Sequence, residues 1–151
     1  MRLLDTDIMI DILRAWGPAL EWLAALDEAP GLPGFVVMEL MWGCKNHQEM
    51  VNLRKRVLPF LIYWPNDRDS NRAMETFSHG RLSHNLGILD ALIGECAVGR
   101  NAVLCTFNVK HFNAVLSLTT EQPYEKNPNY PSSPSLKKSK GPTAEATGEE
   151  K

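Results

Sequence analysis

The sequence predicts a single α/β domain in which helices cover both faces of a parallel sheet. Short apolar segments alternate with segments of helical periodicity, which favours strand–helix–strand units. The last apolar segment, AVLCT at 102–106, carries no charge, as is typical of a parallel strand buried on both faces. Acidic residues stand where apolar segments meet helices, and the carboxyl ends of parallel strands form the binding crevice in such folds.

The chain has 151 residues, 44% of them hydrophobic, which is enough for one domain with a core and too few for two ordinary domains. From residue 122 onward Pro, Ser, Lys, Glu and Gly prevail, and Leu136 is the only large aliphatic residue. Such a segment cannot bury enough apolar surface to offset its ordering entropy. We therefore expect a folded unit at 1–121 and a disordered Pro/Ser/Lys-rich tail at 122–151.

The N-terminal third predicts a strand and two helices. Arg2–Leu4 forms a short strand, and Thr6 or Asp7 then caps a helix whose apolar residues recur at helical spacing. Gly17–Pro18 begins a second helix, which the Ala29–Gly31 segment stops. A strand thus passes directly into a helix near residue 5.

The central third predicts two further strand–helix passages. Leu32–Val37 is short and apolar, so we expect a brief strand that leads into a helix carrying Glu39. His47–Leu58 is helical and closes before Pro59, which lacks the backbone donor that a helix interior needs. Phe60–Trp64 is then a candidate strand.

The last third predicts two helices and a buried strand. Asp67 or its neighbour caps a helix that Gly80 ends. Ile88–Val98 has one apolar face, and Asp90 falls in its first turn, where free N–H groups and the helix dipole favour a negative charge. The apolar strand at 102–106 follows.

Three acids stand at separate junctions between an apolar segment and the start of a helix: Asp5, Glu39 and Asp90. Asn108 stands at a fourth such junction. Acids brought to one end of a sheet repel each other until a cation neutralises them, and Mg²⁺ prefers oxygen ligands. A bound metal lowers the pKa of water and stabilises charge on phosphoryl oxygens, so this pattern indicates phosphodiester hydrolysis. We expect Asp5 and Asp90 to be ligands, Glu39 to be a ligand or base, and Asn108 to orient a water. Taken singly, Asp5 or Asp90 would more often be a helix cap than a metal ligand, and Glu39 could equally point to solvent.

Other metal chemistry is disfavoured. Cys44, Cys96 and Cys105 lie in apolar stretches without ligand spacing, which indicates reduced structural thiols. The four histidines are scattered and form no zinc-binding pair. Acids interrupt the first apolar stretch, and no apolar run approaches the roughly 20 residues of a membrane span. We therefore expect a cytosolic protein with no membrane contact.

A net charge of −2 lacks the strongly basic signature of proteins that bind nucleic acid by electrostatics alone. Basic residues gather locally at Lys45 and at 54–56, where they form either a solvated helix face or a patch that contacts phosphate. Lys137, Lys138 and Lys140 in the predicted tail are open to the same two interpretations.

Four segments together resemble the PIN domain family, in particular VapC-type toxins of bacterial toxin–antitoxin pairs. The segments are LLDTDIMID (3–11), VVMELMWG (36–43), GILDALIGECAVG (87–99) and VLCTFNVKHF (103–112). Each is weakly specific alone, but the four in order cover essentially the whole folded unit. The resemblance implies a Rossmann-like three-layer α/β/α fold with a central parallel sheet, and a ribonuclease that uses Mg²⁺ or Mn²⁺ and leaves a 5′-phosphate and a 3′-hydroxyl.

Carried over by position, Asp5, Glu39 and Asp90 are similar to the first three family acids. Asn108 stands where the family often has aspartate, which keeps an oxygen but removes a charge and puts a second metal in doubt. Thr106 resembles the hydroxyl residue that supports the cluster. Asp7 occupies a place where the family often has Asn or Ser, so it is expected to be an additional outer-sphere acid.

The resemblance also implies partners: an RNA substrate, a second copy in a homodimer, and an antitoxin whose helix enters a groove. An apolar helical surface would suit such partners, although ordinary internal packing accounts for the same residues. Its candidate residues are Trp16, Trp22, Leu26, Met38, Met41 and Trp42. The sequence does not identify the RNA that is cut.

Of three rival interpretations, the first two fail on the sequence and the third remains open. A haloacid-dehalogenase-type phosphatase would use Asp5 as nucleophile and Asp7 as general acid, but no Gly-rich turn follows Asp7. A receiver domain would use Thr106 and Lys110, but it lacks a strand-end aspartate midway along the chain. The third is a PIN-like scaffold that binds RNA or a protein without cleavage, and the amide at Asn108 motivates it.

Overall fold

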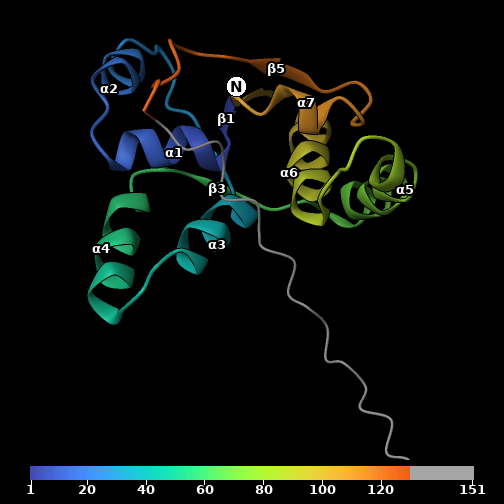
Figure 1. Ribbon diagram of the computed structural model, residues 1–151, viewed down its shortest axis with the longest axis horizontal. Helices are drawn as coiled ribbons and strands as arrows, with labels where there is room; N and C mark the ends of the chain where they lie inside the picture. The colour runs from blue at the N-terminus through green and yellow to red at the C-terminus, as the bar shows by residue number, and fades with distance from the viewer. Residues whose placement is uncertain (130–151) are drawn as a thin grey trace, which may run out of the picture.

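The computed structural model describes residues 1–129 and contains a sheet of three parallel strands (Figure 1). The strand β4 (Val103–Cys105) lies between β1 (Arg2–Leu4) and β5 (Thr119–Glu121). Leu3 is opposite Leu104 in the register of β1 and β4. Because β1 and β4 are apolar and largely buried, this pair lies in the core, as the sequence predicts.

Two shorter strands extend this sheet on the other side of β1. The strand β2 (Leu32–Pro33) pairs in parallel with β3 (Ile62–Tyr63). The N–H of Leu4 donates to the carbonyl of Gly31 at 3.0 Å, and the N–H of Gly31 donates to the carbonyl of Arg2 at 2.9 Å. These bonds join β2 to β1, so the strand order is β3-β2-β1-β4-β5.

Helices cover both faces of this sheet, which gives the predicted three-layer α/β/α arrangement. In Figure 1, α1, α2 and α4 lie on one side of the strands, and α5 and α6 lie on the other. Helix α3 packs against α1, α4 and α6. Within residues 1–129 the helices are α1 (Thr6–Leu13), α2 (Gly17–Ala24), α3 (Gly34–Trp42), α4 (His47–Val57), α5 (Asp67–Ser83), α6 (Ile88–Gly99) and α7 (Val109–Phe112).

Several element bounds differ from the sequence prediction. Helix α2 ends at Ala24, before the predicted stop at 29–31, and α3 begins at Gly34, inside the predicted strand at 32–37. Helix α1 is capped by Asp5 rather than by Thr6 or Asp7, since Oδ1 of Asp5 accepts the N–H of Thr6 at 2.8 Å. Gly80 does not end α5, which continues past it. A Cβ at Gly80 would lie 2.8 Å from Cβ of Ala114, so a glycine is needed there for close packing and not for a helix end.

The C-terminal part of the described chain extends the packed unit. The strand β5 was not predicted, because its sequence TTE is polar and partly exposed. Beyond it, Tyr124 packs against Trp22 and Phe107, so packed contacts continue past residue 121. The rest of the predicted tail, 130–151, lies outside the described residues and stays a prediction.

The three cysteines are free thiols, and Cys96 and Cys105 are buried. Burial raises the pKa of Cys105 to about 12, which agrees with an inert structural role. Within residues 1–129 no helix has the length and apolar character to cross a membrane. The cytosolic location stays a prediction.

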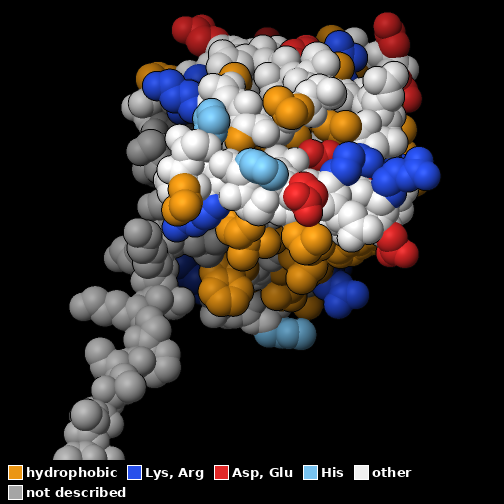
Figure 2. Space-filling model, turned by 90° about the vertical axis from the view of Figure 1, so that its right-hand side faces the viewer, with side chains coloured by type: hydrophobic (Ala, Val, Ile, Leu, Met, Phe, Trp, Pro, Cys, Tyr) orange, Lys and Arg blue, Asp and Glu red, His pale blue; other side chains and the backbone are white. Residues whose placement is uncertain are grey.

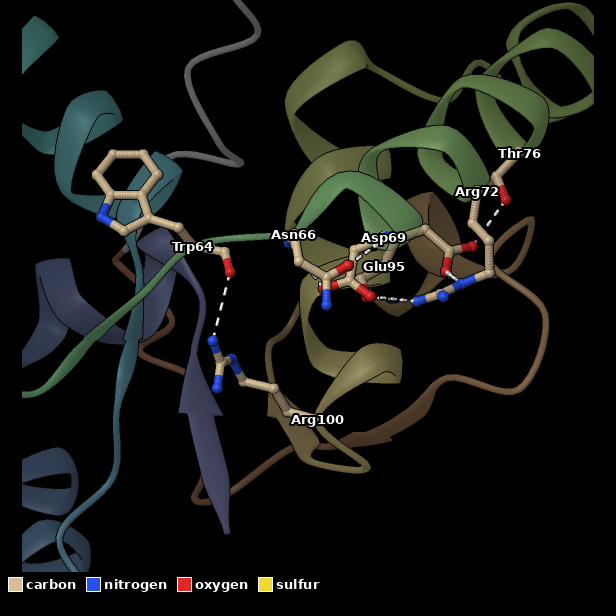
Figure 3. A network of polar contacts seen from close by, with 7 residues as sticks. All are labelled: Trp64, Asn66, Asp69, Arg72, Thr76, Glu95 and Arg100. Atoms are coloured by element: carbon tan, nitrogen blue, oxygen red, sulfur yellow. Dashed lines mark hydrogen bonds and ion pairs between the residues drawn. The ribbon is translucent and has the colours of Figure 1, made fainter.

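A buried ionic network joins α5 to α6, the helix that carries Asp90 (Figure 3). Arg72 donates to Oε2 of Glu95 at 2.8 Å and to Oδ1 of Asp69 at 2.7 Å. The hydroxyl of Thr76 donates to the other oxygen of Glu95 at 2.8 Å. Asp69 also forms a capping box with Asn66 at the start of α5. These shared partners fix α6 against α5.

We predict that Glu95→Ala lowers the free energy of unfolding by about 2 kcal/mol, because Arg72 and Thr76 lose an acceptor in a buried place. Glu75→Ala, on the exposed surface of α5, is the matched control and should change stability by less than about 0.5 kcal/mol. Urea denaturation followed by circular dichroism measures both. Equal losses in the two variants would show that the network does not stabilise the α5–α6 pair.

Candidate metal centre

Asp5 lies at the junction of β1 and α1 and is 4% exposed. Its backbone N–H continues the sheet by donating to the carbonyl of Cys105 at 3.0 Å. Its carboxylate accepts the N–H of Thr6 and the hydroxyl of Thr106, each at 2.8 Å. Burial raises the pKa of Asp5 well above its ordinary value and repulsion from Asp7 adds to this, while the two hydrogen bonds act in the opposite direction.

Glu39 lies on α3 and is half-buried. Its Oε2 accepts a hydrogen bond from the hydroxyl of Thr6, the residue whose N–H donates to Asp5. Thr6 therefore links the two acids, and sequence reasoning did not single it out for this role. Burial raises the pKa of Glu39, and the negative charges of Asp90 and Asp7 raise it further.

Asp90 lies in the first turn of α6, as predicted, and is half-buried. Nδ1 of His111 lies 3.7 Å from its Oδ2. Burial raises the pKa of Asp90, whereas the charge of His111 and a hydrogen bond from the Gly87 backbone lower it. The sequence showed only four scattered histidines and did not connect His111 to Asp90, because nothing in the spacing of the two residues links them.

Thr106 and Asn108 follow β4. Thr106 is fully buried, and its hydroxyl both donates to Asp5 and accepts the N–H of Asn108 at 3.0 Å. Asn108 is the N-cap residue of α7. The predicted supporting role of Thr106 has a physical basis, since this hydroxyl orients a buried carboxylate and holds the following turn.

Asp7 has both carboxylate oxygens engaged by the backbone. Oδ1 accepts the N–H of Ile8 and Oδ2 accepts the N–H of Phe107, each at 2.8 Å. Burial raises its pKa to about 6, although these two bonds favour the charged form. Asp7 thus fastens α1 to the turn after β4, a structural role beyond the outer-sphere acid that the sequence suggests.

The acids act on one another electrostatically, because the charge of Asp90 raises the pKa of both Asp5 and Glu39. Within residues 1–129, no three His, Cys, Asp or Glu side chains are placed to hold one ion together directly. Mg²⁺ keeps several waters and usually takes one or two carboxylates. The donors are oxygens throughout and carry mutual repulsion that a cation relieves, so this set fits a hydrated Mg²⁺ or Mn²⁺ held by Asp5 and Asp90 with Glu39 nearby.

Comparison with protein families supplies the identification. The model of the PIN domain matches residues 2–115. The chain belongs to the PIN domain family. Four segments predicted this membership from the sequence, and the matched range covers all of them.

Solved structures similar to this PIN domain come from toxin–antitoxin systems. A toxin–antitoxin complex from Klebsiella pneumoniae contains a chain 25% identical, with a TM-score of 0.67, and the match covers 83% of this chain and 100% of that one. VapBC2 from Rickettsia felis, bound to a promoter DNA fragment, is 23% identical with a TM-score of 0.67, covering 80% and 96%. VapBC from Salmonella typhimurium, bound to DNA, is 17% identical with a TM-score of 0.69, covering 80% and 96%. Comparison with curated proteins gives no match.

We predict that Thr106→Val lowers the free energy of unfolding by about 1–3 kcal/mol, because Asp5 loses a donor and the N–H of Asn108 loses an acceptor. Thr119→Val, at an exposed position of β5, is the control for the same chemical change. Chemical denaturation gives both values. A Thr106→Val protein as stable as the wild type would mean that the hydroxyl does not support Asp5.

Proposed function

We propose that this PIN domain is a metal-dependent endoribonuclease that hydrolyses RNA phosphodiester bonds with Mg²⁺ or Mn²⁺. The observation that carries the proposal is a set of three partly or fully buried acids from separate parts of the chain: Asp5, Glu39 and Asp90. The charge of Asp90 raises the pKa of the other two. A buried acid without a neutralising partner is costly, so such a set is retained where it binds a cation. Family membership and the toxin–antitoxin neighbours support the same function.

Each residue of the proposed site has a separate role. Asp5 and Asp90 hold the ion, Glu39 acts as ligand or base, and Asn108 orients a water. Thr6 holds Asp5 and Glu39 in a fixed relation by donating to both. When bound, the metal lowers the pKa of water and stabilises the charge that grows on the phosphoryl oxygens. By family similarity the cut leaves a 5′-phosphate and a 3′-hydroxyl.

A second candidate function is a PIN scaffold that binds RNA or a protein without cleavage. The amide at Asn108 favours it, because the fourth acidic position of the family then lacks its charge. The retained acids Asp5, Glu39 and Asp90 favour the nuclease. Cleavage assays separate the two.

We also infer that the protein is the toxin of a VapBC-type pair, with an antitoxin partner and a homodimeric state. The neighbours named above are toxin–antitoxin complexes. Figure 2 shows hydrophobic side chains gathered on the lower part of one face. Of the residues expected at a partner surface, Met38 and Trp42 are exposed, Trp42 to 81%, whereas Trp16 and Trp22 pack against the core.

We predict that Asp5→Asn reduces Mn²⁺-dependent cleavage of total RNA about a hundredfold or more, because the ion loses a charged ligand. Asp67→Asn, an exposed acid in the first turn of α5, is the control and should keep wild-type activity. Rates from gel-resolved cleavage, with and without EDTA, give the comparison. A wild type that cuts no RNA, or equal cleavage by Asp5→Asn, would favour the scaffold.

Metal binding should stabilise the fold, because the ion relieves repulsion among the acids. We predict that Mn²⁺ at a hundred times its dissociation constant adds about 2.7 kcal/mol to stability, read as a rise in Tm. The rise should shrink in Asp90→Asn and persist in Asp67→Asn. Scanning calorimetry with EDTA reversal tests this, and the same Tm in Mn²⁺ and EDTA would contradict a metal site.

A further inference from the structure

The segment after β5, residues 122–126, returns to the part of the fold that carries the acids. We refer to it as the C-terminal strap. The ring of Tyr124 lies 5.2 Å from the ring of Phe107, edge to face, and 5.9 Å from the ring of Trp22. Its hydroxyl donates to Oδ2 of Asp11 at 2.8 Å. Tyr124 thus joins α1, α2 and the turn after β4.

Phe107 is the point through which this contact reaches the acids. Its N–H donates to Asp7, and its chain neighbours Thr106 and Asn108 are the residues that orient Asp5 and begin α7. Edge-to-face aromatic pairs contribute beyond the area they bury. The ring of Tyr124 therefore contacts the turn at 106–108 through the side chain of Phe107, in addition to the polar contacts of that turn.

Asp11 gives the strap a second anchor on α1. Its side chain is buried, and a buried carboxylate requires a hydrogen-bond partner. Burial raises the pKa of Asp11, whereas the Tyr124 hydroxyl and the charge of Lys126 favour its charged form. Lys126 also acts electrostatically on Asp7. Asp7 and Asp11 are one turn apart on α1, so the strap is tied to the helix that begins at Asp5.

We propose that Tyr124 is a positioning residue of the nuclease site: by clamping Phe107 and Asp11 it holds the 106–108 turn, and through it the orientation of Asp5. This inference rests on the proposed nuclease function. It places part of the active-site support in a segment whose composition predicts a tail, beyond the matched residues 2–115. Tyr124 acts through Phe107 and Thr106 and touches none of Asp5, Glu39 or Asp90 in the contacts described above.

The test compares Tyr124→Phe and Tyr124→Ala in the full chain, with Tyr63→Phe and Tyr63→Ala as controls for the same chemical changes on β3. Tyr63 is half-buried and packs against Arg100, away from the strap. Amide hydrogen exchange by NMR reports the turn directly. In Tyr124→Ala we expect the amides of Phe107 and Asn108 to exchange about tenfold faster or more, with those of β4 unchanged. Tyr124→Phe, which keeps the ring, should show a smaller change.

Calorimetric Mn²⁺ binding is the second measurement, and it does not require cleavage. Tyr124→Ala should weaken Mn²⁺ affinity about tenfold, as loss of a group that orients a ligand does, while the Tyr63 variants bind like the wild type. In cleavage assays kcat should fall with KM within about twofold, since the variant loses orientation at the reacting centre and not substrate binding.

The inference is overturned if Phe107 exchanges at the wild-type rate in Tyr124→Ala. It is also overturned if β4 amides accelerate by the same factor, which would indicate general destabilisation, or if Tyr63→Ala accelerates Phe107 equally. A wild type that neither binds Mn²⁺ nor cuts RNA defeats the proposed function separately, and the amide data still decide whether Tyr124 holds the turn.

Discussion

The structure depends on one buried carboxylate held between two parallel strands. Asp5 directly follows β1, and its N–H donates to Cys105 at the end of β4, so the strand register itself brings Thr106 to Asp5 from a hundred residues away. A buried carboxylate is tolerated only when donors satisfy it. Thr6 supplies one donor and Thr106 the other. The same contacts therefore cap α1, hold the turn after β4 and fix the orientation of the Asp5 carboxylate.

Satisfying Asp5 does not remove the electrostatic cost of the site. Burial raises the pKa of Asp5, Glu39 and Asp90, and the charge of Asp90 adds to the rise for Asp5 and Glu39, so the protein without a cation carries repulsion among these acids. Such repulsion persists only where the surrounding structure holds the charged residues in place. Here the α5–α6 network fixes the helix that carries Asp90, and the β1–β4 pairing fixes the strand that precedes Asp5.

The sequence was sufficient for the order of the elements from β1 to β4, the parallel sheet and the junctions at which the acids stand, because apolar periodicity and helix-start residues mark them locally. It was not sufficient where a contact between residues far apart in the sequence determines the local structure. In the sequence, Gly80 indicates a helix end, but in the structure a glycine is needed at this position for close packing against Ala114. The polar strand β5 has no apolar pattern, and Tyr124 lies in a Pro-rich composition. Likewise, the bonds of Asp7 to the 106–108 turn exist only after folding.

The two expected ligands differ in freedom, and this difference fits the demands of a hard cation. Asp5 is almost fully buried and held by hydrogen bonds from two threonines, whereas the side chain of Asp90 is 27% exposed with His111 at 3.7 Å. Mg²⁺ requires near-ideal octahedral geometry, so at least one ligand must adjust to the position that the other fixes. Asp90 has more room to move because its side chain is more exposed, while Glu95, farther along the same helix, joins α6 to α5. In the proposed metal site, Asp5 would be the rigid ligand and Asp90 the more mobile ligand on an anchored helix.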